Sequence, residues 1–273
     1  MTKVLVFAGK KQSGKDSAAN FLTGFLLREA GVIDHFDINE EGQLEVNAVF
    51  RNGEGNEEHD MGVLDLNRGL LGDWEFIDYA SRRIWPIVKV YHFADTLKRF
   101  VNEVFGVPLH LLYGNNDAKG KPTDIKWSNF SKFMAPRNVK KLKDNGLYKK
   151  NMTIRELLKY FGTDVCRHLT PNCWRNSCFS QIADEGTEFA IVADGRFANE
   201  ISSDEELEIK SIYFTKQIEE DSHKSENGFD DDLTGFDAVI DNQDMTIKEK
   251  NEAILNTLLE WGWLKPVMEE ANA

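Results

Sequence analysis

The sequence predicts an α/β fold, in which a parallel β-sheet is flanked by helices. Five short apolar runs alternate with stretches whose apolar residues recur at helical spacing. The first run passes through a glycine-bounded turn directly into such a helical stretch, which is the order of an α/β unit. The absence of an internal repeat or a low-complexity linker predicts a single domain over 1–273. The runs lie at 4–7, 85–93, 189–193, 211–215 and 238–242.

The turn after the first run has the pattern of a phosphate-binding loop, from Gly9 to Lys15. Its glycines let successive N–H groups point at a phosphate, and the following helix adds partial positive charge. A Gly- and Lys-rich turn between two core elements is the alternative, but the flanking strand and helix favour the phosphate loop. We therefore expect a nucleoside triphosphate to be bound by Lys10, Lys11, Ser13, Gly14, Lys15, Asp16 and Ser17.

Asp16 occupies the position at which such loops usually carry Ser or Thr, whose hydroxyl binds Mg²⁺. Ser17 follows one residue later. Because Mg²⁺ favours hard oxygen ligands, the Asp16 carboxylate is a candidate metal ligand. Two roles stay open for Asp16, namely ligation of the metal and capping of the helix.

Composition limits the partners and the location. The 273 residues include 33 Lys and Arg against 46 Asp and Glu, which gives a formal charge of −13. This charge repels polyanions, so we expect no nucleic-acid and no anionic-membrane binding, although a few converging basic residues can hold a small anion. We expect neither a signal peptide nor a membrane span, and the three cysteines lack metal-site or disulfide spacing. These features predict a reduced, cytoplasmic protein.

Two stretches interrupt the predicted sheet. The acidic stretch 34–73 contains an alternating run at 44–50 and a turn at 51–56, which predicts a small β-hairpin insertion. We favour surface decoration over a direct substrate role for it. The stretch 113–152 is turn-rich and basic, with five lysines between 140 and 150. It is interpreted as a lid-like insertion that closes over phosphates, with a solvated loop as the alternative.

Lys98 lies one turn into a helix that follows the run 85–93 and that Asp95 or Thr96 can cap. Open α/β sheets bind ligands at this end of their strands, so Lys98 is a candidate substrate ligand. A solvated surface lysine is the alternative. The run 189–193 likewise leads into three charged residues that we assign to the site rather than to structural ion pairs, Asp194, Arg196 and Glu200.

Thr153 and Glu156 form a capping box at the start of a helix that we expect to end at Gly162. A glycine break with hydroxyl and backbone donors beside two arginines suits a monophosphate, and a simple helix–helix corner is the alternative. Trp174 follows on a segment suited to core packing or to base stacking. The candidate ligands around the break are Arg155, Gly162, Thr163 and Arg167.

The polar stretch 221–226 predicts a loop or lid, in which the lone His223 is more typical of a solvated side chain than of a catalytic one. The run at 238–242 and a helix over 246–261 close the predicted domain.

The ordered set of motifs along nearly the whole chain resembles phage-type deoxynucleoside monophosphate kinases. The resemblance includes Asp16, and it departs at Lys159, where the family often has Gln, and at Ala198, where Pro is common. It implies a nucleoside monophosphate kinase fold on a five-stranded parallel sheet, with ATP and Mg²⁺ as cosubstrates. The matching pieces are 9–16, 93–98, 113–114 with Lys121, 155–158, 161–164 with Arg167 and Trp174, 194–200, 223–226 and 240–242.

The resemblance also implies the site residues. The loop binds the ATP phosphates, and Asn242, in the last matching piece, is assigned to the ATP site. Lys15, Arg167, Asp194 and Arg196 are the candidate catalytic residues, and Asp16 is the candidate metal ligand. The acceptor nucleotide is expected to contact Lys98, Arg155, Gly162, Thr163, Trp174, Asp194, Arg196 and Glu200.

We therefore expect ATP-dependent phosphorylation of a deoxynucleoside monophosphate to the diphosphate, in the host cytoplasm if the chain is encoded by a phage. The alternatives are a kinase for another small phosphate, because animal-type phosphomevalonate kinases share the loop pattern with Asp16, and a nucleotide-binding protein without catalysis. A homodimer stays open. The base preference of the acceptor and the role of 34–73 are also open at this point.

Overall fold

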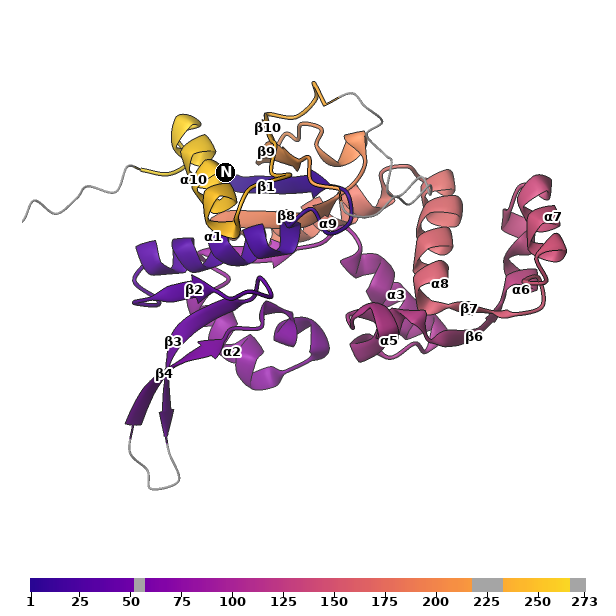
Figure 1. Ribbon diagram of the computed structural model, residues 1–273, viewed down its shortest axis with the longest axis horizontal. Coiled ribbons are helices and arrows are strands. Elements are labelled where there is room, and N and C mark those ends of the chain that lie inside the picture. Colours follow the sequence, from indigo (N-terminus) through magenta and orange to yellow (C-terminus); the bar gives the residue numbers. More distant parts are fainter. Residues whose placement is uncertain (52–56, 218–232, 266–273) are drawn as a thin grey trace, which may run out of the picture.

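The computed structural model describes residues 1–51, 57–217 and 233–265. Its centre is a five-stranded sheet in which every neighbouring pair of strands is parallel (Figure 1), as the apolar runs predict. The phosphate-loop strand β1 lies in the middle of the sheet. In sheet order the strands are β10 (Ala238–Ile240), β9 (Leu207–Phe214), β1 (Thr2–Gly9), β8 (Phe189–Gly195) and β5 (Val88–Tyr91).

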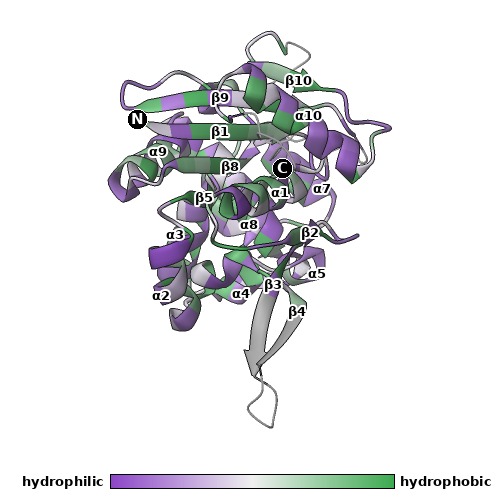
Figure 2. Cartoon of the chain, turned by 90° about the vertical axis from the view of Figure 1, so that its left-hand side faces the viewer, coloured by the Kyte–Doolittle hydropathy of each residue, from purple (hydrophilic) through white to green (hydrophobic). Residues whose placement is uncertain are grey.

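Helices cover both faces of this sheet because its central strands are apolar on both sides (Figure 2). In β1, Leu5 and Phe7 point to one face, and Val4 and Val6 point to the other; all four are fully buried. Burial of such a side chain stabilises the fold by about 1.5–3 kcal/mol. The first face is covered by α1 (Lys15–Glu29), α2 (Trp74–Arg83) and α10 (Ile247–Glu260), and the second by α9 (Cys173–Glu185).

A group of short elements between β5 and α9 has a core of its own, centred on Leu112, Met152 and Leu157. The solvated loop that was the alternative for 113–152 does not describe this stretch, because short helices and a two-stranded sheet occupy much of it (Figure 1). Its closure over phosphates stays a prediction. These elements are α3 (Asp95–Phe105), α4 (Leu109–Leu112), α5 (Asn116–Gly120), β6 (Pro122–Lys126), α6 (Trp127–Phe130), a 3-10 turn (Ser131–Phe133), α7 (Pro136–Asp144), β7 (Asn151–Thr153) and α8 (Ile154–Tyr160).

The predicted hairpin is present as β3 (Leu44–Arg51) and β4 (Glu57–Val63), which pair antiparallel. A third strand, β2 (Phe36–Ile38), pairs with β3 and was not predicted, because three residues carry too little periodicity. Most of the turn expected at 51–56 lies outside the described residues. A 3-10 turn (Leu66–Leu71) then leads to α2.

Two local predictions after α2 are wrong. The second strand begins at Val88 rather than at residue 85, since the N–H groups of Ile87 and Val88 both bond to the Ile84 carbonyl in a turn. Neither Asp95 nor Thr96 caps α3, whose N-cap is Ala94 without a side-chain bond. Among the described residues, no helix has the length and apolar character of a membrane span.

The expected helix break at Gly162 is also wrong. The capping box of Thr153 and Glu156 starts α8 as predicted, but the chain then continues into a π-helical turn, η3 (Phe161–Arg167). A Cβ at Gly162 would lie 2.6 Å from Cδ2 of Leu97. Glycine therefore leaves space for the Leu97 side chain where η3 lies against α3, and it does not end a helix.

Candidate active site

The carboxyl ends of all five sheet strands meet at one edge, and a cavity of about 490 Å³ opens there. The cavity brings together residues from the phosphate loop, the β5–α3 turn, α8 and η3, and the end of β8. Of the predicted residues, Lys10, Ser13, Gly14, Ser17 and Asn242 are not among its lining. Those that line it are Lys11, Lys15, Asp16, Lys98, Arg155, Gly162, Thr163, Arg167, Trp174, Asp194, Arg196 and Glu200.

The phosphate loop has left-handed backbone at Gly14, with φ of +91°, immediately before α1. Gly9 at the end of β1 has φ of +143°, and a Cβ there would lie 2.7 Å from the Phe214 carbonyl oxygen. The Lys15 ammonium folds back over the loop and donates hydrogen bonds to the carbonyls of Gly9 (2.8 Å) and Lys10 (2.7 Å). The loop is thus wrapped around its lysine.

Ser17 and Asp16 face different surroundings at the start of α1. The Ser17 hydroxyl donates to the Gly14 carbonyl (3.1 Å) and accepts from Lys250 Nζ (2.6 Å) on α10. Asp16 is exposed and lines the cavity. Of the two, Asp16 is therefore the side chain with an oxygen directed to the ligand space.

Asn242 lies behind the loop rather than in the cavity. Its side chain is 3% exposed, and its Nδ2 donates to the Ser13 carbonyl at 2.9 Å. Its Oδ1 accepts from the Lys216 N–H at 2.9 Å. Asn242 thus links the loop to the end of β9. Lys10, for its part, reaches outward to Oε1 of Gln217 at 2.9 Å.

Asp194 joins the ends of two strands. Its carboxylate accepts the backbone N–H groups of Phe93 (2.7 Å) and Ala94 (3.1 Å), at the turn that leads into α3. The carboxylate still lines the cavity. Asp194 therefore fixes the position of the turn next to the ligand space.

Glu200 is the most deeply buried charged residue of the site, at 1% exposed. It accepts the N–H groups of Arg196 (2.7 Å) and Phe197 (3.0 Å) and forms an ion pair with Arg167. Burial raises the pKa of Glu200 to about 7, against the opposing effect of Arg167. The Arg167 guanidinium also lies 3.9 Å from the Phe197 ring centroid. Glu200 thus holds both the loop that carries Arg196 and the side chain of Arg167.

Lys98 projects from α3 into a charged cluster. Its Nζ donates to Oδ1 of Asp95 at 3.2 Å and lies 4.1 Å from the Tyr113 ring centroid. The other Asp95 oxygen faces His92 Nδ1 at 3.4 Å. Burial opposes ionisation of Asp95, but His92 and Lys98 outweigh it and lower the pKa of the carboxyl. Lys98 is therefore held in place, unlike a solvated surface lysine.

Lys119 on α5 belongs to the same cavity and was not predicted. Burial, with Lys98 and Arg155 nearby, lowers the pKa of Lys119 to about 8. Arg155 donates to Oδ1 of Asn116, one turn before Lys119, at 2.6 Å. The lysine lies in the basic stretch 113–152, but no sequence spacing separates it from the solvated lysines there.

Trp174 supports η3 from α9. Its indole Nε1 donates to the Gly162 carbonyl at 3.0 Å, within the π-helical turn that also carries Thr163 and Arg167. The Trp174 side chain is partly buried between two hydrophobic clusters. Trp174 therefore packs in the core and also lines the cavity, and its role in base stacking stays a prediction.

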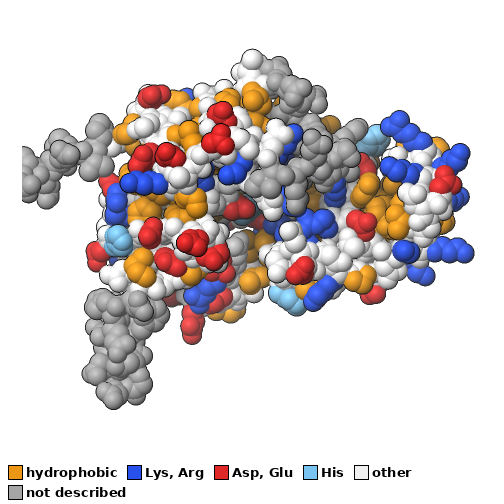
Figure 3. All heavy atoms as spheres, in the orientation of Figure 1, with side chains coloured by type: hydrophobic (Ala, Val, Ile, Leu, Met, Phe, Trp, Pro, Cys, Tyr) orange, Lys and Arg blue, Asp and Glu red, His pale blue; other side chains and the backbone are white. Residues whose placement is uncertain are grey.

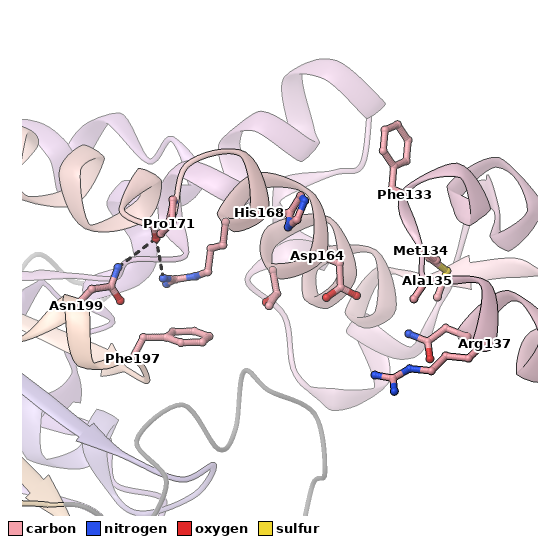
Figure 4. A pocket seen from close by; sticks show the side chains of 12 residues that line it. Phe133, Met134, Ala135, Arg137, Asp164, His168, Pro171, Phe197 and Asn199 are labelled. Carbon is pink, nitrogen blue, oxygen red and sulfur yellow. Dashed lines mark hydrogen bonds between the residues drawn. The ribbon is translucent and has the colours of Figure 1, made fainter.

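A second groove of about 680 Å³ lies between α7 and η3 and shares Thr163, Arg167 and Phe197 with the cavity (Figure 4). Arg137 and Asp164 point into it from its two sides. Lys and Arg side chains also gather over α6 and α7 (Figure 3). The cations that line the cavity itself come instead from the phosphate loop, α3, α5, α8, η3 and the segment after β8. Their convergence in an acidic protein suits phosphorylated ligands.

A model of the deoxynucleotide monophosphate kinase family matches residues 89–253, more than half of the chain. The chain belongs to this family. The family phosphorylates deoxynucleoside monophosphates and, as a kinase family, implies ATP as the donor. The resemblance is confirmed, and both alternatives, a kinase for another small phosphate and a non-catalytic protein, are set aside. The phosphate loop of this kinase precedes the matched region. No curated protein sequence matches the chain.

Proposed function

We propose that the kinase binds ATP at the phosphate loop and the acceptor monophosphate on the opposite wall of the same cavity. The observation that carries this proposal is the shared cavity, which Lys15 lines from the loop and Arg167 and Arg196 line from the other side. A donor and an acceptor bound there would have their phosphates between the two sets of cations. Such positioning is most of what phosphoryl transfer requires, and it needs no covalent intermediate.

The loop side would hold the donor. Backbone N–H groups at the start of α1 bind the ATP phosphates, and the Lys15 ammonium exchanges its carbonyl partners for phosphate oxygens. Lys11 adds a further cation on this side. Arg196 neutralises the charge of the transferring group, because an arginine fork can contact two phosphate oxygens at once.

The acceptor would be held by side chains from the other elements. Lys98 and Arg155 bind its phosphate, with Lys119 as an additional ligand, and Trp174 forms one wall of its site. Arg167 and Glu200 keep this wall in position through their ion pair. We also propose that the basic stretch 113–152 closes over the phosphates and that the protein acts in the cytoplasm. A homodimer remains a hypothesis.

Mg²⁺ fits the site through Asp16. The carboxylate is exposed, lines the cavity and follows Lys15 directly. No group of three His, Cys, Asp or Glu in the described part of the chain could hold a metal. Mg²⁺ is usually bound by one or two carboxylates together with substrate phosphates, which is the arrangement that we propose for Asp16. When bound, the ion neutralises charge on the phosphate oxygens, while Asp16 orients it at the loop.

Acceptor screening tests the proposal. The purified kinase is given ATP, Mg²⁺ and each deoxynucleoside monophosphate in turn, and ADP release is followed with coupling enzymes. We expect turnover with at least one deoxynucleoside monophosphate and background release with phosphomevalonate. ATP hydrolysis that no monophosphate accelerates would contradict the proposed acceptor site.

A further inference from the structure

Lys250 is a buried lysine on α10 that contacts the back of the phosphate loop. Its side chain is 4% exposed, although most lysines extend into water. The Lys250 ammonium donates to the Gly14 carbonyl at 3.0 Å and to the Ser17 hydroxyl at 2.6 Å. It is not among the residues that line the cavity. Lys250 therefore reaches the loop from the side opposite the proposed phosphates.

The position is unfavourable for a lysine unless the contacts compensate for it. Burial, together with the nearby Lys216, lowers the pKa of Lys250 to about 8 against the opposing effect of Asp16. An ammonium with two good acceptors regains part of the hydration that it loses. Hydrophobic packing of α10 against α1 does not require a charge here, because Ile254 and Leu258 on the same helix provide it.

The geometry of the peptide bond shows what these contacts do. In a trans peptide the C=O and the following N–H point in opposite directions. Asn242 holds the Ser13 carbonyl, which belongs to the peptide unit of the Gly14 N–H. The Gly14 carbonyl belongs to the peptide unit of the Lys15 N–H. It accepts from Lys250 at 3.0 Å, and also from the Ala18 N–H and the Ser17 hydroxyl of α1, both at 3.1 Å. Two successive carbonyls are thus bonded away from the cavity, which aims the paired N–H groups toward it.

We propose that Lys250 is a positioning residue that fixes the carboxyl end of the phosphate loop for ATP binding. This inference rests on the proposed function, because it requires ATP to bind at that loop. Lys250 also holds the Ser17 hydroxyl away from the cavity. The arrangement assigns the two lysines different tasks: Lys15 contacts phosphate, and Lys250 helps to hold the peptide unit between Gly14 and Lys15.

Lys250→Met tests the proposal, because methionine keeps the length and apolar stem of lysine and removes the ammonium. Lys248→Met is the matched control, since Lys248 lies one half-turn away on α10 with 87% of its side chain exposed. Isothermal titration calorimetry gives the Kd of ATP and of the acceptor monophosphate for each protein. We expect Lys250→Met to weaken ATP binding about tenfold, as for loss of one charged hydrogen bond. The acceptor Kd and the Lys248→Met values should stay within about twofold of wild type.

Ser17→Ala keeps the test informative if Lys250→Met does not fold. This variant removes one acceptor of the Lys250 ammonium, so it should weaken ATP binding by about threefold. In the variant that carries both Ser17→Ala and Lys250→Met, the loss of ATP affinity should equal that of Lys250→Met alone. ATP affinities equal to wild type in either single variant would overturn the positioning role. An equal loss of ATP and acceptor affinity would also overturn it, as the sign of a general structural effect. Failure of the wild-type kinase to bind ATP would instead refute the loop assignment itself.

Discussion

Replacing Trp174 with phenylalanine removes one hydrogen bond and leaves most of the aromatic surface in place. The bond joins the indole Nε1 to the Gly162 carbonyl at 3.0 Å, and Gly162 is buried. Leaving a buried carbonyl without its donor costs about 1–3 kcal/mol. For a chain of this length, a loss of about 2 kcal/mol lowers the Tm by roughly 4–8 °C.

The functional consequence is confined to the acceptor. The π-helical turn that Trp174 holds carries Thr163 and Arg167, and neither residue belongs to the phosphate loop. We expect Trp174→Phe to raise the KM for the monophosphate about tenfold, equivalent to about 1.4 kcal/mol, and to leave the KM for ATP within about twofold.

Trp263→Phe is the matched control. Trp263 is 6% exposed, and its indole Nε1 donates to Oε1 of Glu208 at 2.8 Å, so this variant also loses one indole hydrogen bond. Trp263 does not line the cavity. Its replacement should therefore lower the Tm without a change in either KM. Steady-state kinetics and calorimetric melting of the two variants give the comparison. A wild-type monophosphate KM in Trp174→Phe would refute the positioning argument.

Three further outcomes follow from the site. Arg196→Lys keeps the positive charge but removes the guanidinium, which can contact two phosphate oxygens at once. We therefore expect either a higher KM for the acceptor or a lower kcat, and wild-type kinetics with a lowered Tm would identify Arg196 as a structural residue. Asp16→Ala should raise the Mg²⁺ concentration that gives the half-maximal rate. An unchanged dependence of the rate on Mg²⁺ would leave capping of the helix as the only role of Asp16. The pKa of Glu200 is raised from 4.5 to about 7, so its stabilising contribution is present at low pH and is lost as the pH rises through this range. In the Glu200→Gln variant, the free energy of unfolding measured with urea should no longer show this fall between about pH 5 and pH 8. The same fall in the variant as in the wild type would contradict the raised pKa of Glu200.

Much of the fold could be predicted because its signals are local. Apolar runs mark the five strands, and the capping box at Thr153 fixes one helix start. The π-helical turn could not be predicted, because its contacts with Leu97 and Trp174 come from distant segments. The order of strands in the sheet likewise depends on long-range pairing, which no local pattern contains.

The position of many candidate residues at the cavity could be predicted from the sequence, but the contacts that they make could not. Residues at strand ends, such as Asp194 and Arg196, lie where parallel strands predict them. Their bonding partners are backbone groups of other segments, which residue types do not reveal. Lys250 had a usable signal, because it falls four residues before Ile254 and eight before Leu258, on the buried stripe of α10.

Transfer of labelled phosphate tests the central claim most directly. The kinase is mixed with ATP labelled at the γ-phosphate and a deoxynucleoside monophosphate, and the products are separated by chromatography. The label should appear in the deoxynucleoside diphosphate, about a hundredfold more slowly with Lys15→Ala, whose fold is checked by circular dichroism. Near-normal transfer by this variant, or label found only in inorganic phosphate with the wild-type kinase, would contradict the account.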